Sequence, residues 1–342
     1  MPLPGPTPAP AARGGLVLGC GSATELARCY AQALGRRFQE LPADRPVAEA
    51  LAAADRTESV LVVLPEPGCD LATVTRLVET ARRHRIRFGL LPLSADPTEA
   101  LHLVVRSWAA QVAPAPDHAH RTMLYCDFRR EAPAGPALSY GSDGSEEFVT
   151  RLREGAQAVV LHSHGNGADF RVGSHVLCLQ VDRLRPEPAR PGERHLPCQG
   201  GGGCRLAHKT SFRAFHGAAA LRARLLVLLS CSAYQPADGL LDARFQLSRT
   251  LLYGPHVAGF VASTRINHGT VQLGVAVERL LDQGASLGEV ALRINLLAGE
   301  GLASYVCVGD PELAAPPAPA RPAPARTAAT RPEPARAAAT RP

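Results

Sequence analysis

Arg222–Ser230 reads RARLLVLLS and is the most strand-like run of the 342-residue chain. A short, nearly uninterrupted apolar run is typical of a strand buried on both faces of a parallel sheet. Similar runs recur along the chain and alternate with segments of helical spacing, which predicts an α/β protein with a mostly parallel central sheet. The predicted strands are Leu16–Gly19, Ser59–Pro65, Phe88–Leu93, Thr122–Phe128, Ala156–Ser163, Arg222–Ser230, His256–Ser263 and Ser304–Val308.

Composition divides the chain into four parts. Residues 1–13 and 314–342 are rich in Pro, Ala and Arg, cannot build a core and are predicted to be disordered. Residues 14–115 are predicted to form a small Rossmann-like or flavodoxin-like α/β domain, and residues 116–313 a larger α/β domain. Within the larger domain, Phe170–Val181 alternates polar and apolar residues and predicts a hairpin around Gly173.

The overall composition favours a soluble protein with reduced thiols. Apolar residues make up 46% and charged residues 20%, and no run approaches the roughly 18 apolar residues of a membrane helix. The first residues lack the apolar core of a secretory signal, and nine cysteines are too sparse for a disulfide scaffold, so a cytoplasmic location is expected. The net charge is +6, and five Arg against one Glu place +4 of it on the C-terminal tail. We expect a solvated tail with at most weak contacts to acidic partners, no specific nucleic-acid partner and no membrane.

Two of the predicted strands end in residues that could carry catalysis. Ala156–Ser163 leads into His164-Gly165, and Arg222–Ser230 leads directly into Cys231. Because the carboxyl ends of parallel strands meet at one edge of a sheet, His164 and Cys231 would lie side by side if their strands are neighbours. An imidazole can activate a thiol as a nucleophile and then protonate the leaving amine. The backbone N–H groups of Gly165 and Cys231 could hold the oxyanion that develops.

Neither residue is informative alone. A cysteine after an apolar strand is most often a small buried apolar residue, and a single histidine is usually structural or exposed. The pair is more specific, because both members follow strands and both lead into small or flexible residues. His162 should point to the same side of its strand as His164, but only His164 is followed by glycine, so His162 is interpreted as a neighbour.

Four segments of the chain resemble clan CD cysteine peptidases, the group of caspases, separases, gingipains and bacterial CHAT-domain proteins. SHGNGADF is similar to the His-Gly segment of separases and CHAT domains, and LLSCSA to their nucleophile segment. GPHVAGFVAS resembles the CHAT strand that follows the nucleophile helix, and YVCVGDPEL the terminal Gly-Asp-Pro strand end. The resemblance covers about residues 120–313, and the CHAT family is the best match. These segments are residues 163–170, 228–233, 254–263 and 305–313.

The resemblance implies a caspase-like three-layer sandwich and endopeptidase activity on a protein substrate. Such proteins are commonly regulated by a protein partner or an attached domain, and none of this chemistry requires a cofactor. The chain departs from the usual CHAT pattern, since Ser230 stands where Ala is usual and Ala233-Tyr234 stands near the expected Thr-Gly. These departures leave the subfamily and the substrate open.

In this clan, an acidic pocket would select an Arg or Lys residue of the substrate. Each acidic candidate is individually more often a cap, a turn residue or a solvated group. Asp127 stands first, because it ends a predicted strand of the same sheet. The candidates are Asp127, Asp238, Asp242 and Asp310.

A second constellation lies in a Gly-rich stretch between the two candidate catalytic residues. His195, Cys198, Cys204 and His208 are ligand types that can hold Zn tetrahedrally, although their spacing matches no standard zinc finger. The alternative is an insertion loop that happens to contain two cysteines and could act as a lid. Two other functions therefore stay open: a zinc-dependent binding protein that uses residues 195–208, and a non-catalytic interaction module that kept the peptidase fold.

The first predicted strand ends in Gly19-Cys20-Gly21, a possible phosphate-binding turn. The G-x-G-x-x-G pattern is incomplete, because position 24 is Thr. A tight turn from strand to helix is therefore favoured, and no nucleotide is predicted.

Overall fold

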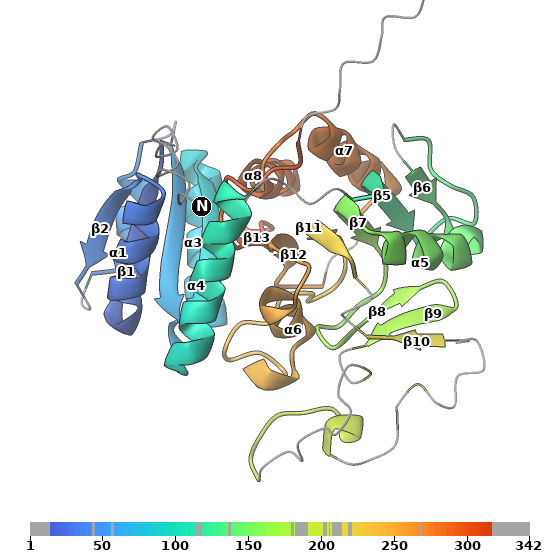
Figure 1. The fold of residues 1–342 in the computed structure, drawn as a ribbon, viewed down its shortest axis with the longest axis horizontal. Helices are drawn as coiled ribbons and strands as arrows, with labels where there is room; N and C mark the ends of the chain where they lie inside the picture. The colour runs from blue at the N-terminus through green and yellow to red at the C-terminus, as the bar shows by residue number, and fades with distance from the viewer. Residues whose placement is uncertain are drawn as a thin grey trace, which may run out of the picture.

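A single ten-stranded sheet runs through the computed structural model (Figure 1), in the order β2-β1-β3-β4-β13-β12-β11-β7-β5-β6. The sheet is mixed but mostly parallel, because β12–β13 is the one antiparallel pair in that order. A second sheet has the order β10-β9-β8. The structure describes residues 14–42, 45–55, 58–113, 118–135, 138–178, 181, 191–200, 204, 206, 214–217, 221–266 and 269–316.

The N-terminal half alternates strands and helices, as the apolar runs predict. Helices α3 and α4 begin at the aspartate caps Asp70 and Asp96, whose carboxylates accept hydrogen bonds from amides of the first turn. Its elements are β1 (Leu16–Cys20), α1 (Thr24–Ala33), β2 (Arg37–Leu41), α2 (Val47–Ala52), β3 (Ser59–Pro65), α3 (Leu71–His84), β4 (Arg87–Leu93) and α4 (Pro97–Val112).

The C-terminal half continues the alternation with longer loops. Helices α7 and α8 are capped by Thr270 and Ser286. Its elements are β5 (His120–Cys126), β6 (Leu138–Tyr140), α5 (Ser145–Glu154), β7 (Ala156–His162), β8 (Asp169–Val172), β9 (His175–Cys178), β10 (Ala214–His216), β11 (Ala223–Leu228), α6 (Leu247–Tyr253), β12 (Gly259–Ser263), α7 (Val271–Asp282), α8 (Leu287–Ala298) and β13 (Tyr305–Val308).

The eight predicted strands are confirmed, and so is the hairpin around Gly173, where β8 and β9 pair antiparallel. Strand β2 was missed, because its sequence RFQEL is largely solvent-exposed and lacks an apolar run at the sheet edge. Strand β13 joins the two halves: it pairs antiparallel with β12 and parallel with β4. Residues 14–115 and 116–313, predicted as two domains, therefore share one continuous sheet.

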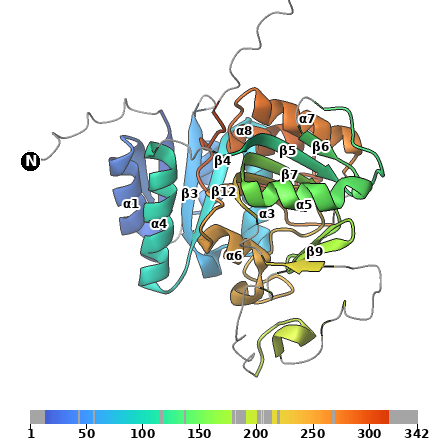
Figure 2. The same ribbon diagram turned by 45° about the vertical axis from the view of Figure 1, so that its right-hand side comes forward.

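Helices cover both faces of the sheet, which gives three layers (Figures 1 and 2). On one face α1 contacts α4, and α4 contacts α6; on the other, α2 contacts α3, α3 contacts α8, and α8 contacts α7. Strands β3, β4 and β11 are almost wholly buried, as expected for apolar strands between two helix layers. The fold class is thus a three-layer α/β sandwich around a mostly parallel sheet.

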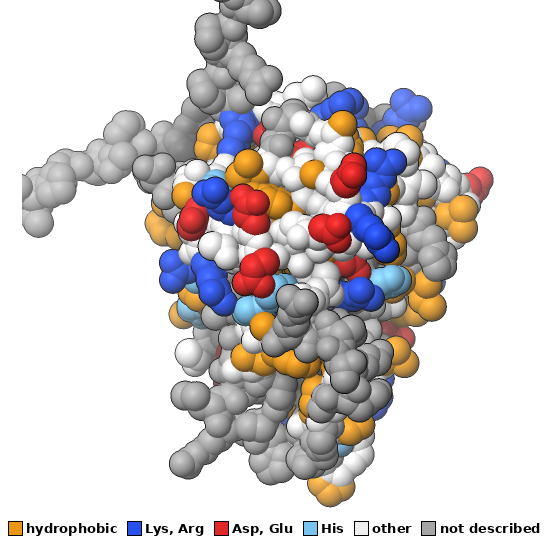
Figure 3. Space-filling view, turned by 90° about the vertical axis from the view of Figure 1, so that its right-hand side faces the viewer, with side chains coloured by type: hydrophobic (Ala, Val, Ile, Leu, Met, Phe, Trp, Pro, Cys, Tyr) orange, Lys and Arg blue, Asp and Glu red, His pale blue; other side chains and the backbone are white. Residues whose placement is uncertain are grey.

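Among the described residues, no helix is both long and apolar enough to cross a bilayer. The side of the molecule that bears α5 and α7 shows acidic and basic side chains interspersed rather than gathered by sign (Figure 3). Ion pairs such as Arg151 with Glu147 account for part of this pattern on α5.

Glu278 on α7 has a buried carboxyl group with few hydrogen-bond partners among the described residues. Its side chain is 0% exposed, and its Oε1 accepts a hydrogen bond of 3.0 Å from Ser139 Oγ. Within the described residues Oε2 has no hydrogen-bond partner. Burial raises the pKa of Glu278 to about 7, because the charged form is poorly solvated there.

The raised pKa predicts a stability that falls with pH. The folded state binds the Glu278 proton more tightly than the unfolded state, so proton binding at Glu278 stabilises the folded state. This stabilisation is fully present below about pH 4.5 and is lost as the pH rises through about 7. Glu278→Gln should raise the free energy of unfolding at pH 8 by on the order of 2 kcal/mol and flatten its pH dependence. Urea unfolding at pH 5 and pH 8 measures this, with the exposed Glu147→Gln as control; an unchanged pH dependence in Glu278→Gln would contradict the prediction.

Candidate active site

Strands β7 and β11 bring His164 and Cys231 to neighbouring strand ends. The two strands are adjacent and parallel, with Leu161 paired with Leu228 at the end of the ladder. The amide of the next residue on β11 still donates to Leu161 O at 2.8 Å. His164 and Cys231 each lie three residues beyond this last pair, in the segments that leave the same edge of the sheet.

One face of β7 and β11 contributes to the core cluster beneath α7 and α8, to which Val160 on β7 and Val227 on β11 belong. His164 and Cys231 each follow these valines by four residues, beyond the last residues of β7 and β11. His164 is exposed and Cys231 is half-buried, so the pair lies at the rim of the core rather than inside it.

The loop after β7, which we call the His loop (163–170), has a conformation that depends on glycine. Gly165 forms an antiparallel bridge with Phe170, and a Cβ atom at Gly165 would lie 2.3 Å from the Phe170 ring. Asn166 Oδ1 accepts hydrogen bonds of 3.0 and 3.1 Å from the amides two and three residues on. Gly167 has a φ of +77°, which favours glycine. Among the described residues the Gly165 N–H makes no hydrogen bond, so this donor is available to a ligand.

The His164 ring is held against an aromatic side chain. Its centroid lies 4.9 Å from that of Phe128 in an edge-on arrangement, and the His162 ring lies 4.8 Å from the same phenyl group. His162 is buried, its Nε2 lies 3.0 Å from Gly269 O, and its Nδ1 lies 3.7 Å from Cys126 Sγ.

His162 and Cys126 form another histidine–cysteine pair, but their surroundings disfavour the thiolate and imidazolium forms that an activated pair requires. Burial lowers the pKa of His162 and raises the pKa of Cys126, so both groups are driven toward their neutral forms. A neutral imidazole that donates to Gly269 O has no free N–H for a leaving group. His162 therefore supports the site as a neighbour of His164, in line with the interpretation of the sequence.

The backbone turns sharply at the residue after Cys231. Ser232 has a φ of +45°, in the left-handed region that non-glycine residues rarely adopt, and its amide donates to Arg265 O at 2.9 Å. Strained backbone of this kind persists where the surroundings hold it, and such positions concentrate at functional sites. The amide of Tyr234 donates to Ser263 O at 3.0 Å, so the end of β12 fixes the chain after Cys231.

Tyr305, at the start of β13, is a neighbour of Cys231 that the sequence did not reveal. Burial, and then the charge of the Cys231 thiolate, raise the pKa of Tyr305. Its hydroxyl is buried, and the described residues offer it no hydrogen-bond partner. The antiparallel pairing of β13 with β12 brings this side chain to the same sheet edge. No local sequence signal could have placed it there.

Gln235 joins the His loop to the loop between β11 and α6, which we call the Cys loop (232–246). Its side chain is buried; Nε2 donates to Asn166 O at 3.0 Å, and Oε1 accepts from Leu241 N at 3.0 Å. A Cβ at Gly167 would lie 2.6 Å from Gln235 Nε2. One end of the Gln235 amide thus binds the His loop, and the other end binds the Cys loop to which Gln235 itself belongs.

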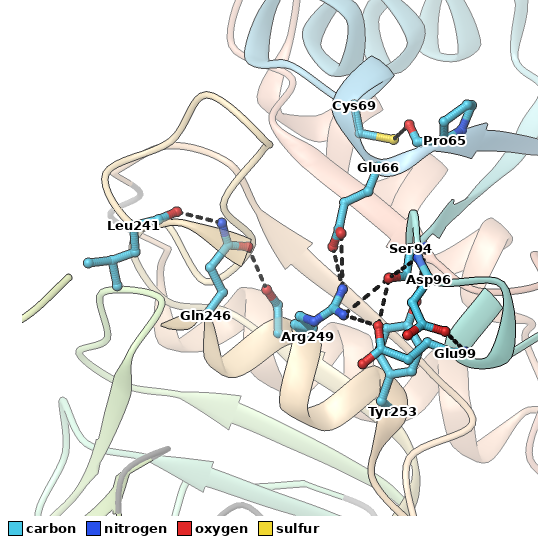
Figure 4. A network of polar contacts seen from close by, with 11 residues as sticks. Pro65, Glu66, Cys69, Ser94, Asp96, Glu99, Leu241, Gln246, Arg249 and Tyr253 are labelled. Atoms are coloured by element: carbon cyan, nitrogen blue, oxygen red, sulfur yellow. Dashed lines mark hydrogen bonds and ion pairs between the residues drawn. The ribbon is translucent and has the colours of Figure 1, made fainter. Parts of the chain in front are cut away.

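The far end of the Cys loop is anchored to the N-terminal half (Figure 4). Arg249 on α6 pairs with Glu66 at 2.7 Å, after β3, and with Glu99 on α4. The Arg249 guanidinium also lies 4.7 Å from the centre of the Tyr253 ring. Because β3 and β4 belong to the same sheet as β11, this network ties the Cys loop to a rigid element.

The carboxylate of Asp127 has partners within the protein. It accepts hydrogen bonds from Tyr125 Oη at 2.8 Å and from Gly173 N at 3.0 Å, and it pairs with Arg171 at 3.2 Å. The Asp127 side chain is 3% exposed. Asp127 lies beside the His162 strand end, since its amide donates to His162 O.

Asp238 and Asp242 lie on the Cys loop and have different partners. Asp238 Oδ1 accepts a hydrogen bond of 2.6 Å from Leu71 N, at the start of α3. Asp242 binds Arg194 through its side chain and its main chain. Both carboxylates thus belong to the loop that follows Cys231. The Asp242 carboxylate already accepts a hydrogen bond from the Arg194 guanidinium group.

Asp310 faces the N-terminal half of the molecule. Its carboxylate binds Arg36 at 2.8 and 3.1 Å and accepts a hydrogen bond from Tyr30 Oη. The side chains of Asp310 and Arg36 are 0% and 1% exposed. Asp310 follows β13 at the end away from Tyr305. The fold therefore does not bring Asp310 to the sheet edge at which β7 and β11 end.

The residues of the zinc hypothesis are described in part. His195 Nδ1 lies 3.0 Å from Leu196 O, Cys198 is half-buried and Cys204 is exposed, while His208 lies outside the described residues. No group of three or more metal-ligating side chains comes together within the described ranges. The nine cysteines form no disulfide. Zinc at residues 195–208 stays a prediction.

Comparison with known proteins gives a resemblance of fold. No protein-family model matches the chain, and no curated protein matches it. The crystal structure of the Arg-specific cysteine proteinase gingipain R is similar over 90% of this chain and 80% of its own, with 11% identity and a TM-score of 0.50. A complex of the pro- and mature domains of this proteinase from Porphyromonas gingivalis covers 88% of this chain and 80% of its own, with 10% identity and a TM-score of 0.49. The chain therefore has a caspase-like fold, similar to that of gingipain R.

Proposed function

We propose that the chain is a cysteine endopeptidase of the CHAT type, which cleaves a protein substrate through His164 and Cys231 and is regulated by a protein partner. The observation that carries the proposal is the parallel pairing of β7 with β11, because His164 and Cys231 follow the ends of these neighbouring strands. The half-buried thiol, the exposed imidazole and the strained turn at Ser232 support it. The similarity of fold to gingipain R agrees with this chemistry.

The reaction would be acyl transfer in two steps. The Cys231 thiolate attacks the carbonyl carbon of a peptide bond, and N–H donors such as that of Gly165 stabilise the oxyanion. The C–N bond breaks as the His164 imidazolium gives its proton to the leaving amine, which leaves a thioester on Cys231. Water, deprotonated by the now neutral His164, then attacks the thioester and releases the acid and the thiol.

A direct test is cleavage of a denatured protein mixture followed by peptide mass spectrometry. Wild-type protein should generate new peptide termini, and Cys231→Ala should generate none, because the proposed thioester forms on the Cys231 thiol. Cys307→Ala is a matched control of a buried thiol on the neighbouring β13. Equal cleavage by wild type and Cys231→Ala would refute the proposal.

A further inference from the structure

A short segment of the chain lies against the Cys loop and the His loop, and we call the surface that it covers the groove. This segment, residues 193–196, which we call the strap, reads Glu-Arg-His-Leu. It bonds to residues 237–244 of the Cys loop, and its Leu196 packs against a cluster that includes Ala168 of the His loop. The strap therefore lies against the loop that contains His164 and the loop that follows Cys231.

The arginine of the strap is held through its side chain and its main chain. Arg194 Nε donates to Asp242 Oδ1 at 2.9 Å, Nη2 donates to Ala237 O at 3.0 Å, and Nη1 donates to Gly239 O. The Arg194 amide donates to Asp242 Oδ2 at 3.0 Å, and Arg194 O accepts from Asp242 N at 2.9 Å. We call this set of acceptors, formed by Ala237, Gly239 and Asp242, the arginine cup.

The leucine of the strap fills an apolar site two residues further on. Leu196 packs against a small cluster formed by Ala168, Leu241 and Phe245, which is separate from the two main cores of the described chain. On the other side of the arginine, Glu193 pairs with Arg244 of the Cys loop. The groove thus recognises an acidic residue, an arginine and an aliphatic residue in one extended segment.

The contacts of the strap resemble those of a bound peptide. Main-chain hydrogen bonds with pockets for alternate side chains are a common way for proteins to recognise extended peptides. The Arg194 and Asp242 side chains are 44% and 31% exposed, and partly exposed ion pairs contribute little to stability. A tethered segment competes with a free peptide at an effective concentration of the order of millimolar.

We propose that this groove is a peptide-binding site, filled in cis by residues 193–196, that accepts an Arg-x-aliphatic segment of another polypeptide once the strap is displaced. The inference concerns binding alone, and it stands or falls independently of the proposed peptidase activity. The chemistry of the groove indicates the class of ligand. The carbonyls of Ala237 and Gly239 and the carboxylate of Asp242 accept hydrogen bonds from a guanidinium group, and the Ala168, Leu241 and Phe245 cluster packs against a branched apolar side chain.

Binding of the labelled peptide acetyl-Glu-Arg-His-Leu-amide, followed by fluorescence anisotropy, tests the proposal. All proteins carry Cys231→Ala, so that the peptide cannot be cleaved. Arg194→Ala/Leu196→Ala, which empties the groove, should bind the peptide at least tenfold more tightly than the protein with the native strap. Adding Asp242→Asn should lower this affinity at least tenfold. Adding Asp238→Asn, on the same loop but bonded to Leu71, should not.

A folded, emptied protein that does not bind the peptide, or binding unaffected by Asp242→Asn, would overturn the proposal and leave the strap as a structural anchor. If the double variant does not fold, the protein with its native strap is examined by hydrogen exchange in millimolar peptide. The Arg194 amide, bonded to Asp242, should then exchange faster as the peptide displaces the strap. Unchanged exchange would equally overturn the proposal.

Discussion

Replacing His164 with Ala should lower kcat/KM for peptide cleavage by roughly 10²- to 10⁴-fold, the usual contribution of a positioned acid–base group. His164 follows β7, whose parallel neighbour β11 ends three residues before Cys231. His162 should not replace it, because its Nε2 is engaged by Gly269 O and burial lowers its pKa. The same variant should lose little stability, since His164 is exposed.

Initial rates with a substrate peptide identified from the cleavage products measure this effect. His102→Ala, another exposed histidine, on α4, is the control and should retain the wild-type kcat/KM. Thermal unfolding of both variants separates a catalytic loss from a folding defect. A His164→Ala protein that keeps the wild-type kcat/KM would remove His164 from the mechanism.

Replacing Asp310 with Ala should lower the free energy of unfolding by roughly 3–5 kcal/mol, because it leaves the Arg36 guanidinium buried without a counter-charge. The two side chains are 0% and 1% exposed and share two hydrogen bonds, and Tyr30 Oη also donates to the Asp310 carboxylate. The pair links the end of β13 to the segment between α1 and β2, so its loss weakens the union of the two halves of the sheet.

Urea unfolding of Asp310→Ala measures the loss. The exposed pair of Arg28 and Glu40 provides the matched control, and Glu40→Ala should cost less than about 1 kcal/mol. The double variant Arg36→Met/Asp310→Leu should recover much of the stability, because it removes both charges together. If Asp310 instead lined a substrate pocket, Asp310→Ala would change cleavage specificity while leaving the free energy of unfolding unchanged.

The strands could be predicted because their signals are local. The LLVLL core of RARLLVLLS is uninterrupted by polar residues, and that pattern suits few places other than a buried strand. The pairing of β7 with β11 confirms that the two predicted strands are neighbours. The roles of His164 and Cys231, which follow these strands, stay a prediction.

The supporting residues could not be predicted, because their contacts join distant parts of the chain. Gln235 is an ordinary polar residue in a loop until tertiary structure places it between Asn166 and Leu241. Tyr305 reaches the site through the antiparallel pairing of β13, which no local pattern encodes. The continuous sheet has the same origin, since one short strand joins β12 to β4.

Charged groups were the least predictable part of the site. The sequence marks Asp127 and Asp310 as acidic residues near strand ends, but burial and partners decide what they can do. Asp127 is held by Tyr125, Gly173 and Arg171, and Asp310 by Arg36 and Tyr30. A buried carboxylate requires such partners because its desolvation is costly, and these partners are specified by the fold.

The proposed mechanism requires that His164 activates Cys231 as a nucleophile. The rate at which each of the nine thiols reacts with a peptide acyloxymethyl ketone, resolved by mass spectrometry, tests this requirement. Cys231 should react fastest, although Cys29 and Cys204 are more exposed, and His164→Ala should abolish this preference. Labelling of Cys231 no faster than that of Cys29 and Cys204, or labelling unchanged in His164→Ala, would contradict the claim.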